Sequence, residues 1–230
     1  MTVADFALQL KTETKKSHTA AENTKFVGSF LRGVVSKESY KQLVANFYFI
    51  YRAMEEEMEK LKESPIVGPI HSQLLNRTNN LERDLRYFYG PMWRTLIVPT
   101  EQCQRYVNRI REVADDEPEL LIGHQYTRYM GDLSGGQILK GIAEKSLNLK
   151  DNEGLWFYEF EGISDKKGFK TQYRNTLNTI PITQSMANAI INEANYAFRL
   201  NMYMFDELQG NGAQSLFKVI IGFIFSGFKK

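Results

Sequence analysis

The sequence predicts one all-α domain, and three observations support this fold class. Apolar residues recur at alternating steps of three and four along much of the chain, which is the period of amphipathic helices. The 230 residues are enough to bury one core, and no linker, internal repeat or low-complexity segment divides them. No strand-like run is longer than residues 96–98, which Pro99 terminates.

Two amphipathic helices are expected in the first half of the chain. The first carries a long apolar stripe and ends before the Ser-Pro pair at residues 64–65. The second repeats the pattern over residues 81–88 and stops at Gly90, which Pro91 follows. The stripe of the first helix consists of Leu43, Phe47, Ile50, Tyr51, Met54, Met58 and Leu61.

Further helices are expected in the second half. Residues 106–113 show the same spacing, and Pro118 suits the first turn of the next helix, with the acids of residues 115–117 near its positive end. A last long helix is expected to end at the Gly-Asn-Gly of residues 210–212. Its stripe consists of Ile190, Ala194, Ala197, Phe198, Asn201, Phe205 and Leu208.

The C-terminal segment is treated separately, as a tail of residues 211–230 after a domain of residues 1–210. Residues 216–228 are apolar, but Lys218, Gly222 and Gly227 interrupt them, and the run is shorter than the ~20 residues that span a bilayer. We therefore expect no transmembrane anchor. The tail could pack on the body, be partly disordered, or contact a membrane surface or a partner.

Composition excludes several classes of protein. Lys and Arg number 29 against 27 Asp and Glu, a balance that argues against a nucleic-acid partner. Cys103 is the only cysteine, which excludes an internal disulfide, a cysteine zinc site and an iron–sulfur cluster held by this chain alone. No targeting signal precedes the first helix, so a soluble cytoplasmic protein is expected. No hydrolase, zinc-protease or phosphate-loop motif occurs.

The most unusual passage is residues 126–137, where three glycines and one carboxylate fall within a helical region. Gly131, Gly135 and Gly136 together cost roughly 2–3 kcal/mol of helix stability relative to alanine. Such a loss suggests that the bare helix face has a use. A flat ligand could lie against this backbone, with Asp132 and Ser134 as the polar groups nearby.

The three histidines are the candidate metal ligands. His71 follows Gly-Pro in an expected loop and is interpreted as solvated, and His124 as a hydrogen-bonded core residue. His18 lies four residues before Glu22, so a carboxylate can face its ring and strengthen it as a metal donor, although such pairs also occur on solvated helix faces. One imidazole, a glycine-rich helix with one acid, and scattered cations together suit haem with one axial ligand.

The chain closely resembles the biliverdin-producing haem oxygenases over nearly its whole length. Its short body and the Leu-Asn-Arg run at residues 75–77 are most similar to the soluble cyanobacterial and algal forms, and the apolar tail has no counterpart there. The matching segments are the region around His18, Tyr51–Met58, Asp84–Trp93, Glu119–Gln137, Phe169–Asn175 and Glu193–Gln209.

This resemblance implies a role for each matching residue. His18 would be the iron ligand, with Glu22 bonded to it, and Asp132 would hold a water network, supported by Tyr51 and Arg128, that helps to protonate bound dioxygen. The glycines 131, 135 and 136 would form a kinked distal helix close to haem. The residues expected to meet the haem propionates are Lys11, Lys15, Tyr126, Lys170 and Arg174, and the other expected haem-contacting residues are Thr127, Ser134, Phe198 and Asn201.

The implied reaction converts haem and dioxygen to biliverdin IXα, carbon monoxide and ferrous iron. Arg174 would fix the rotation of the disc so that the α-meso carbon faces the oxygen. Electrons would come from outside, with reduced ferredoxin as the expected donor, and a bilin reductase could act downstream in pigment synthesis. Two alternatives are a non-catalytic haem carrier or sensor and a helical partner-binding module without cofactor.

Overall fold

The computed structural model describes residues 3–226, with side chains for residues 3–209. Within these residues every regular element is a helix, which confirms the all-α prediction. The α-helices are α1 (Phe6–Glu13), α2 (Lys15–Glu22), α3 (Lys25–Leu31), α4 (Lys37–Lys60), α5 (Thr78–Tyr89), α6 (Trp93–Leu96), α7 (Glu101–Asp116), α8 (Leu121–Asp132), α9 (Gly136–Leu147), α10 (Lys166–Thr179) and α11 (Gln184–Ser226). Short 3₁₀ turns are η1 (Gly68–Ile70), η2 (Gln73–Leu75), η3 (Pro118–Leu120) and η4 (Trp156–Tyr158).

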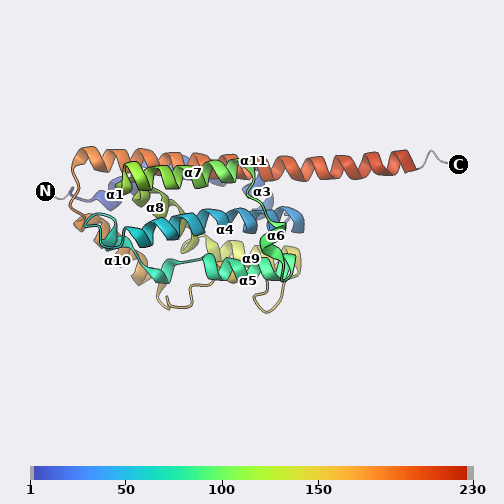
Figure 1. Ribbon diagram of the computed structural model, residues 1–230, viewed down its shortest axis with the longest axis horizontal. Helices are drawn as coiled ribbons and strands as arrows, with labels where there is room; N and C mark the ends of the chain where they lie inside the picture. Colours follow the sequence, from blue (N-terminus) through green and yellow to red (C-terminus); the bar gives the residue numbers. More distant parts are fainter. Residues whose placement is uncertain (1–2, 227–230) are drawn as a thin grey trace.

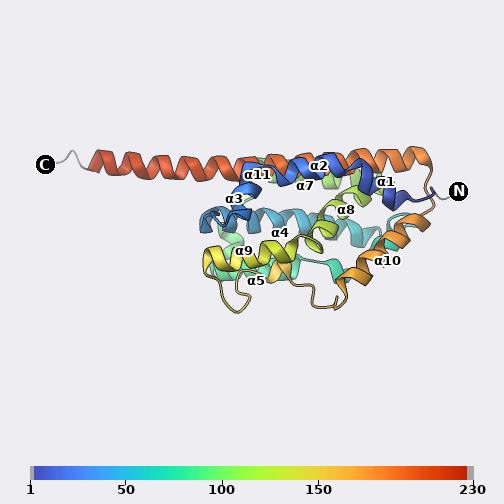
Figure 2. The same cartoon turned by 180° about the vertical axis from the view of Figure 1, so that it is seen from behind.

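The helices are arranged around α11, which runs along the whole length of the body (Figure 1). Helices α7 and α8 pack against it, and α4 packs against both α7 and α5, which lies along the opposite edge. Seen from behind, α1 and α2 lie over α11 (Figure 2), and α3 also contacts it. The chain after α8 continues into α9, which contacts α3 and η4. This arrangement brings α1–α3 and the α8–α9 region together.

Local sequence signals explain where several helices begin and end. Ser36 caps α4 by accepting a hydrogen bond from the Ser39 amide at 3.0 Å, and Asp165 caps α10 through the Gly168 amide at 2.9 Å. These side-chain acceptors satisfy amides that have no partner within the helix. Helix α5 ends at Gly90 with φ of 78°, a backbone conformation that glycine adopts without strain.

The predicted apolar stripes form the core. In α4, every stripe residue from Leu43 to Met58 is buried, and Leu61 packs against the core just after the helix. In α11, Phe205 is partly buried and the other stripe residues are buried. The spacing rule therefore identified the faces on which these two long helices pack against their neighbours.

Of three boundary expectations, only the predicted end of the last helix was wrong. The apolar run at 96–98 is not a strand, because Leu96 ends α6 and Val98 is exposed. Pro118 lies in the first turn of the next helical segment, as expected, because it begins the 3₁₀ turn η3, which leads directly into α8. Helix α11 continues through residues 210–212 to Ser226, because glycine lowers helix stability by about 1 kcal/mol without preventing a helical backbone.

Beyond the body, α11 extends away from the other helices (Figures 1 and 2). Among the helices within residues 3–226, none is long and apolar enough to cross a membrane. The side chains of the expected tail lie outside those described, so the division at residues 210 and 211 stays a prediction.

Asp84 of α5 joins this helix to η4. Its two carboxylate oxygens accept hydrogen bonds from the amides of Trp156 and Phe157, each at 2.8 Å. Burial raises the pKa of Asp84 to about 7, although these two amides and Arg83 act in the opposite direction. The folded protein thus binds a proton at this carboxyl more tightly than an unfolded chain does.

The raised pKa of Asp84 predicts a pH dependence of stability. Between the unfolded pKa of about 3.9 and the folded pKa of about 7, folding takes up a proton, so stability falls by roughly 1.4 kcal/mol per pH unit as pH rises and then levels off. Urea unfolding at pH 5 to 8 should show this slope for the wild type relative to Asp84→Asn. Asp116→Asn, at an exposed acid, controls for the lost charge. Parallel curves for wild type and Asp84→Asn would contradict the expectation.

Candidate functional site

A cavity of about 910 Å³ lies between the N-terminal helices α1–α3, the α8–α9 region and parts of α4, α10 and α11. Most of its wall is apolar, and its polar groups are few. All predicted site residues line it except Tyr51, Lys170 and Asn201. Those that do are Lys11, Lys15, His18, Glu22, Tyr126, Thr127, Arg128, Gly131, Asp132, Ser134, Gly135, Gly136, Arg174 and Phe198.

His18 lies on α2 and is half exposed at this cavity. Its Nδ1 is 3.5 Å from the Glu22 carboxylate, one helical turn later, and the ring meets Phe198 of α11 edge-on at 5.7 Å. A carboxylate beside Nδ1 favours the proton on that nitrogen and leaves the lone pair on Nε2. His18 thus has the surroundings of a metal-ligating imidazole.

The other two histidines have structural partners. His124 is fully buried, and its Nε2 lies 2.9 Å from Glu193, as expected for a hydrogen-bonded core histidine. His71 is not solvated as we expected, since its side chain is only 15% exposed and its Nε2 is 3.1 Å from Glu59 of α4. The loop folds back onto α4, a long-range contact that the local Gly-Pro sequence does not reveal.

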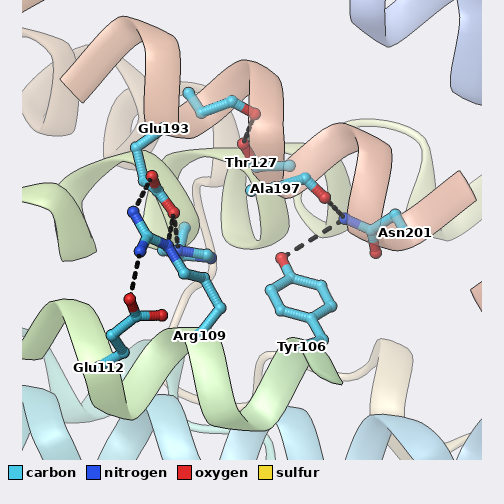
Figure 3. A network of polar contacts seen from close by, with 9 residues as sticks. Tyr106, Arg109, Glu112, Thr127, Glu193, Ala197 and Asn201 are labelled. Atoms are coloured by element: carbon cyan, nitrogen blue, oxygen red, sulfur yellow. Dashed lines mark hydrogen bonds and ion pairs between the residues drawn. The ribbon is translucent and has the colours of Figure 1, made fainter. Parts of the chain in front are cut away.

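Glu193 of α11 joins three helices. Arg109 of α7 donates two hydrogen bonds to it at 2.9 and 2.8 Å, and Glu112 lies 3.0 Å from the same guanidinium (Figure 3). Burial alone would raise the pKa of Glu193, but the bonds from Arg109 and His124 outweigh it and lower the pKa to about 2. The carboxylate therefore stays charged at neutral pH and ties α7 and α8 to α11.

The glycine segment interrupts the distal helix as expected. Helix α8 ends at Asp132, residues 133–135 form turns, and α9 begins at Gly136. Both the Ser134 and the Gly135 amides donate to the Gly131 carbonyl, at 3.1 and 2.8 Å. The helix is therefore kinked beside the cavity, as expected for a bare glycine segment.

The glycines leave room for a ligand and are not required by packing of the chain. A Cβ placed on Gly131 would meet no heavy atom within 4 Å among the described residues, and one on Gly135 would come no closer than 3.8 Å to the Gly131 carbonyl oxygen. Gly123 in the same helix differs, because its Cβ would lie 2.8 Å from the Ala194 amide nitrogen of α11. The cavity-facing glycines thus form a cradle that side chains would fill.

Asp132 is buried at the end of α8 within a hydrogen-bonded network. The Tyr51 hydroxyl donates to its carboxylate, the Arg128 Nε donates to the Tyr51 oxygen at 2.9 Å, and Arg128 Nη2 lies 3.7 Å from Asp132. Burial raises the pKa of Asp132, while Arg128 and Tyr51 counteract this rise. The carboxylate is therefore held in place at the cavity wall by two neighbouring side chains.

Asn201 and Tyr106 extend this network to α11 and α7. Arg128 donates to the Asn201 side-chain oxygen at 2.7 Å. Figure 3 shows the Asn201 amide donating to the Ala197 carbonyl at 2.8 Å and to Tyr106 at 3.4 Å. Asn201 thus supports Arg128 without lining the cavity. Burial works against the charged guanidinium, yet Tyr51 and Asp132 raise the pKa of Arg128, so it stays cationic.

Three of the cations predicted to meet the propionates line the cavity. Lys11 and Lys15 come from the first two helices, and Arg174 from α10. Lys170 is not among the lining residues, but its Nζ donates at 3.0 Å to the hydroxyl of Ser134, which lines the cavity, and its contact with a propionate stays a prediction. It links α10 to the turn between α8 and α9.

Several cavity residues were missed by sequence reasoning. They include aromatic and aliphatic side chains whose helical spacing has the same period as that of ordinary core residues, so no sequence signal separates the two roles. Tyr106 was assigned only to an apolar stripe. The missed aromatic lining residues are Phe26, Phe30, Phe47, Phe157, Tyr158 and Phe205.

The fold and the cavity define a helical protein that can enclose a flat, partly apolar ligand beside an exposed imidazole. Comparison with known proteins narrows this class. The family model for heme oxygenase matches residues 4–207, and the chain belongs to the heme oxygenase family. The chain is 55% identical to heme oxygenase 1 of Nostoc sp. over 208 residues, which cover 90% of this chain and 87% of that protein.

Solved structures agree with this assignment. Heme oxygenase-1 from the cyanobacterium Synechocystis, in complex with heme, superposes with a TM-score of 0.89 at 51% identity, covering 98% of this chain and 100% of that one. Heme oxygenase from Leptospira interrogans gives a TM-score of 0.86 at 41% identity, covering 88% of this chain and 99% of that one. The all-helical fold is therefore shared with other members of the family.

The two glycines of α8 should respond oppositely to alanine. Gly131→Ala should raise the free energy of unfolding by up to about 1 kcal/mol, because it improves helix propensity without a clash. Gly123→Ala should lower it by about 1–3 kcal/mol, because the new Cβ meets the α11 backbone. Urea unfolding of both variants measures this. Destabilisation by Gly131→Ala would show that the space beside it serves packing.

Proposed function

We propose that the protein is a haem oxygenase that cleaves haem to biliverdin IXα, carbon monoxide and ferrous iron. Family membership supports haem degradation, and the crystal structure of the Synechocystis relative in complex with heme supports haem as the bound substrate. The observation that carries the proposal is one cavity lined both by His18 and by a glycine-rich segment with the buried Asp132. Bound haem would supply iron for dioxygen chemistry.

The residues present fit haem. The cavity has the volume and the aromatic wall for a macrocycle, and the open space beside Gly131 allows close approach to backbone. His18 would ligate the iron through Nε2, with Glu22 orienting the ring through Nδ1. Lys11, Lys15 and Arg174 would hold the anionic propionates by charge-assisted hydrogen bonds.

These cations would also set the orientation of the disc. An arginine holds a carboxylate in a fixed, two-point geometry, so Arg174 would limit rotation about the iron–ligand axis. We infer that this selects the α-meso carbon, with the glycine segment as the opposing steric limit. Tyr126 and Thr127, which also line the cavity, would contact the substrate there. Lys170 would act through Ser134, the residue to which it donates.

Asp132 would organise proton delivery. Its carboxylate is fixed by Tyr51, and Arg128 fixes Tyr51 in turn, so ordered water beside Asp132 would have a constant position. Asn201 would support the same arrangement from α11 through its bond to Arg128. A non-catalytic haem carrier or sensor, the alternative function, would not need this buried hydrogen-bonded network around Asp132.

The electron donor would be a separate protein. We propose reduced ferredoxin, because such an acidic protein would complement the cations at the cavity, and relatives of this chain occur in cyanobacteria and algae. The product would pass to a bilin reductase for pigment synthesis. We place this activity in the cytoplasm, with dioxygen as co-substrate.

Removing the distal acid should separate binding from turnover. Asp132→Ala should bind hemin with the wild-type Soret intensity but form biliverdin at least about 100-fold more slowly, since proton delivery would lose its organising group. An absorbance time course in air, with ferredoxin or ascorbate as reductant and catalase present, measures both. Asp116→Asn on the exposed end of α7 is the control. An unchanged biliverdin yield from Asp132→Ala would exclude this role.

Removing the expected iron ligand should be reversible by a replacement. His18→Ala should weaken hemin binding and abolish turnover, and added imidazole should restore part of both, because the half-exposed position leaves access from solvent. His71→Ala, whose side chain pairs with Glu59, is the matched histidine control. If imidazole restored the Soret band without any turnover, ligation alone would not explain the role of His18.

A further inference from the structure

We propose that Arg77, Asn80 and Asp84 are positioning residues that set which meso carbon of haem is attacked. They do so by fixing the turn η4, whose Phe157 and Tyr158 form part of the cavity wall. This inference rests on the proposed function and extends it to residues that do not line the cavity.

The three side chains bind successive backbone groups of the turn. Asp84 accepts from the Trp156 and Phe157 amides, Asn80 donates to the Glu159 carbonyl at 3.0 Å, and Arg77 donates to the Phe157 carbonyl at 3.3 Å and to the Glu159 carbonyl. All three side chains are buried. We call this set the α5 clamp, since its members lie on α5 or at its start.

Groups on other elements hold the same segment. The Gln137 side chain of α9 donates to the Tyr158 carbonyl at 2.9 Å, and the Tyr40 hydroxyl of α4 donates to the Gly154 carbonyl at 3.1 Å. The turn itself contains only three 3₁₀ residues, so it has few internal hydrogen bonds of its own. Its position therefore depends mainly on these outside contacts.

Phe157 and Tyr158 of η4 line the cavity, so a displacement of this turn would reach the substrate. Phe157 packs on Phe47 at 5.1 Å and on Tyr51 at 5.4 Å between ring centroids, and Tyr51 holds Asp132. Tyr158 lies beside the distal glycines, since a Cβ on Gly136 would be 3.5 Å from its ring. The turn thus forms a wall that is continuous with the distal network and with the glycine cradle.

The chemistry of the clamp favours a positioning role over a purely stabilising one. Burying an acid, an amide and a guanidinium carries desolvation costs that an apolar contact would avoid. Hydrogen bonds to specified backbone atoms instead define one position of the turn. The porphyrin ring of haem offers four similar meso edges, so the choice among them depends on the propionate anchors and on the shape of the cavity wall, and a displaced aromatic wall would change that shape.

The test compares substitutions in the clamp with one elsewhere in the core. Asp84→Asn keeps the shape but replaces one amide acceptor by a donor, and Asn80→Ala removes one donor. Ile110→Val in α7 is a buried control away from the cavity. Biliverdin isomers are separated by chromatography, and the haem methyl resonances of the cyanide-bound ferric protein report the in-plane angle of haem without turnover.

We expect both clamp variants to shift the methyl resonances. We also expect biliverdin isomers other than α to make up about a tenth of the product or more, which corresponds to a roughly tenfold change in the ratio of the rates of attack at the different meso carbons. Ile110→Val should keep the wild-type spectrum and isomer even though it lowers Tm. Phe157→Leu changes the wall directly and should shift the same resonances, so the inference stays testable if a clamp variant fails to fold.

Wild-type resonances and a single wild-type isomer in Asp84→Asn, Asn80→Ala and Phe157→Leu, with only Tm lowered, would overturn the inference. Failure of the proposed function looks different. In that case the wild-type protein itself would form no biliverdin, while the methyl resonances would still show whether the clamp sets the angle of bound haem.

Discussion

The crossing of α8 over α11 is the constraint on which the site depends. Gly123 allows the two backbones to touch, and Glu193 fixes the contact by binding His124 of α8 and Arg109 of α7. The first half of α8 is therefore rigidly placed. One turn after this contact, Arg128 reaches Asn201 of α11, so the orientation of Asp132 follows from the same crossing. The glycines from the end of α8 to the start of α9 pack less tightly, because a Cβ on Gly131, Gly135 or Gly136 would meet no described atom closer than 3.5 Å.

The buried polar network and the apolar wall have complementary roles. Asp132, Tyr51 and Arg128 would be costly to bury individually, but each satisfies another, and aromatic residues pack around them. An interior of this kind strengthens electrostatic interactions at the cavity. Among the other residues that line the cavity, His18 is half exposed and the cations of α1, α2 and α10 are exposed. Exposed charged residues and a buried polar network thus line one ligand-sized space.

Much of this arrangement could be predicted from sequence, because its signals are local. The stripes of α4 and α11, the stop at Gly90 and the glycine kink follow from spacing and backbone preference. Resemblance to a family supplied the partners of Asp132. What could not be predicted depends on contacts between distant segments. His71 was interpreted as solvated for this reason, since its contact with Glu59 joins two separate segments. The aromatic cavity wall and the hydrogen bonds from η4 amides to Asp84 likewise have no signal in the local sequence.

The open space beside Gly131 also has a consequence for how this protein can vary. Because no described neighbour requires a glycine there, selection for folding alone would let the position drift to residues that favour helices, whereas Gly123 would be retained. A library screened only for soluble, stable protein would therefore lose the ligand cradle while its fold improved. In this helix the demands of folding and of binding act on separate glycines, eight residues apart in the chain.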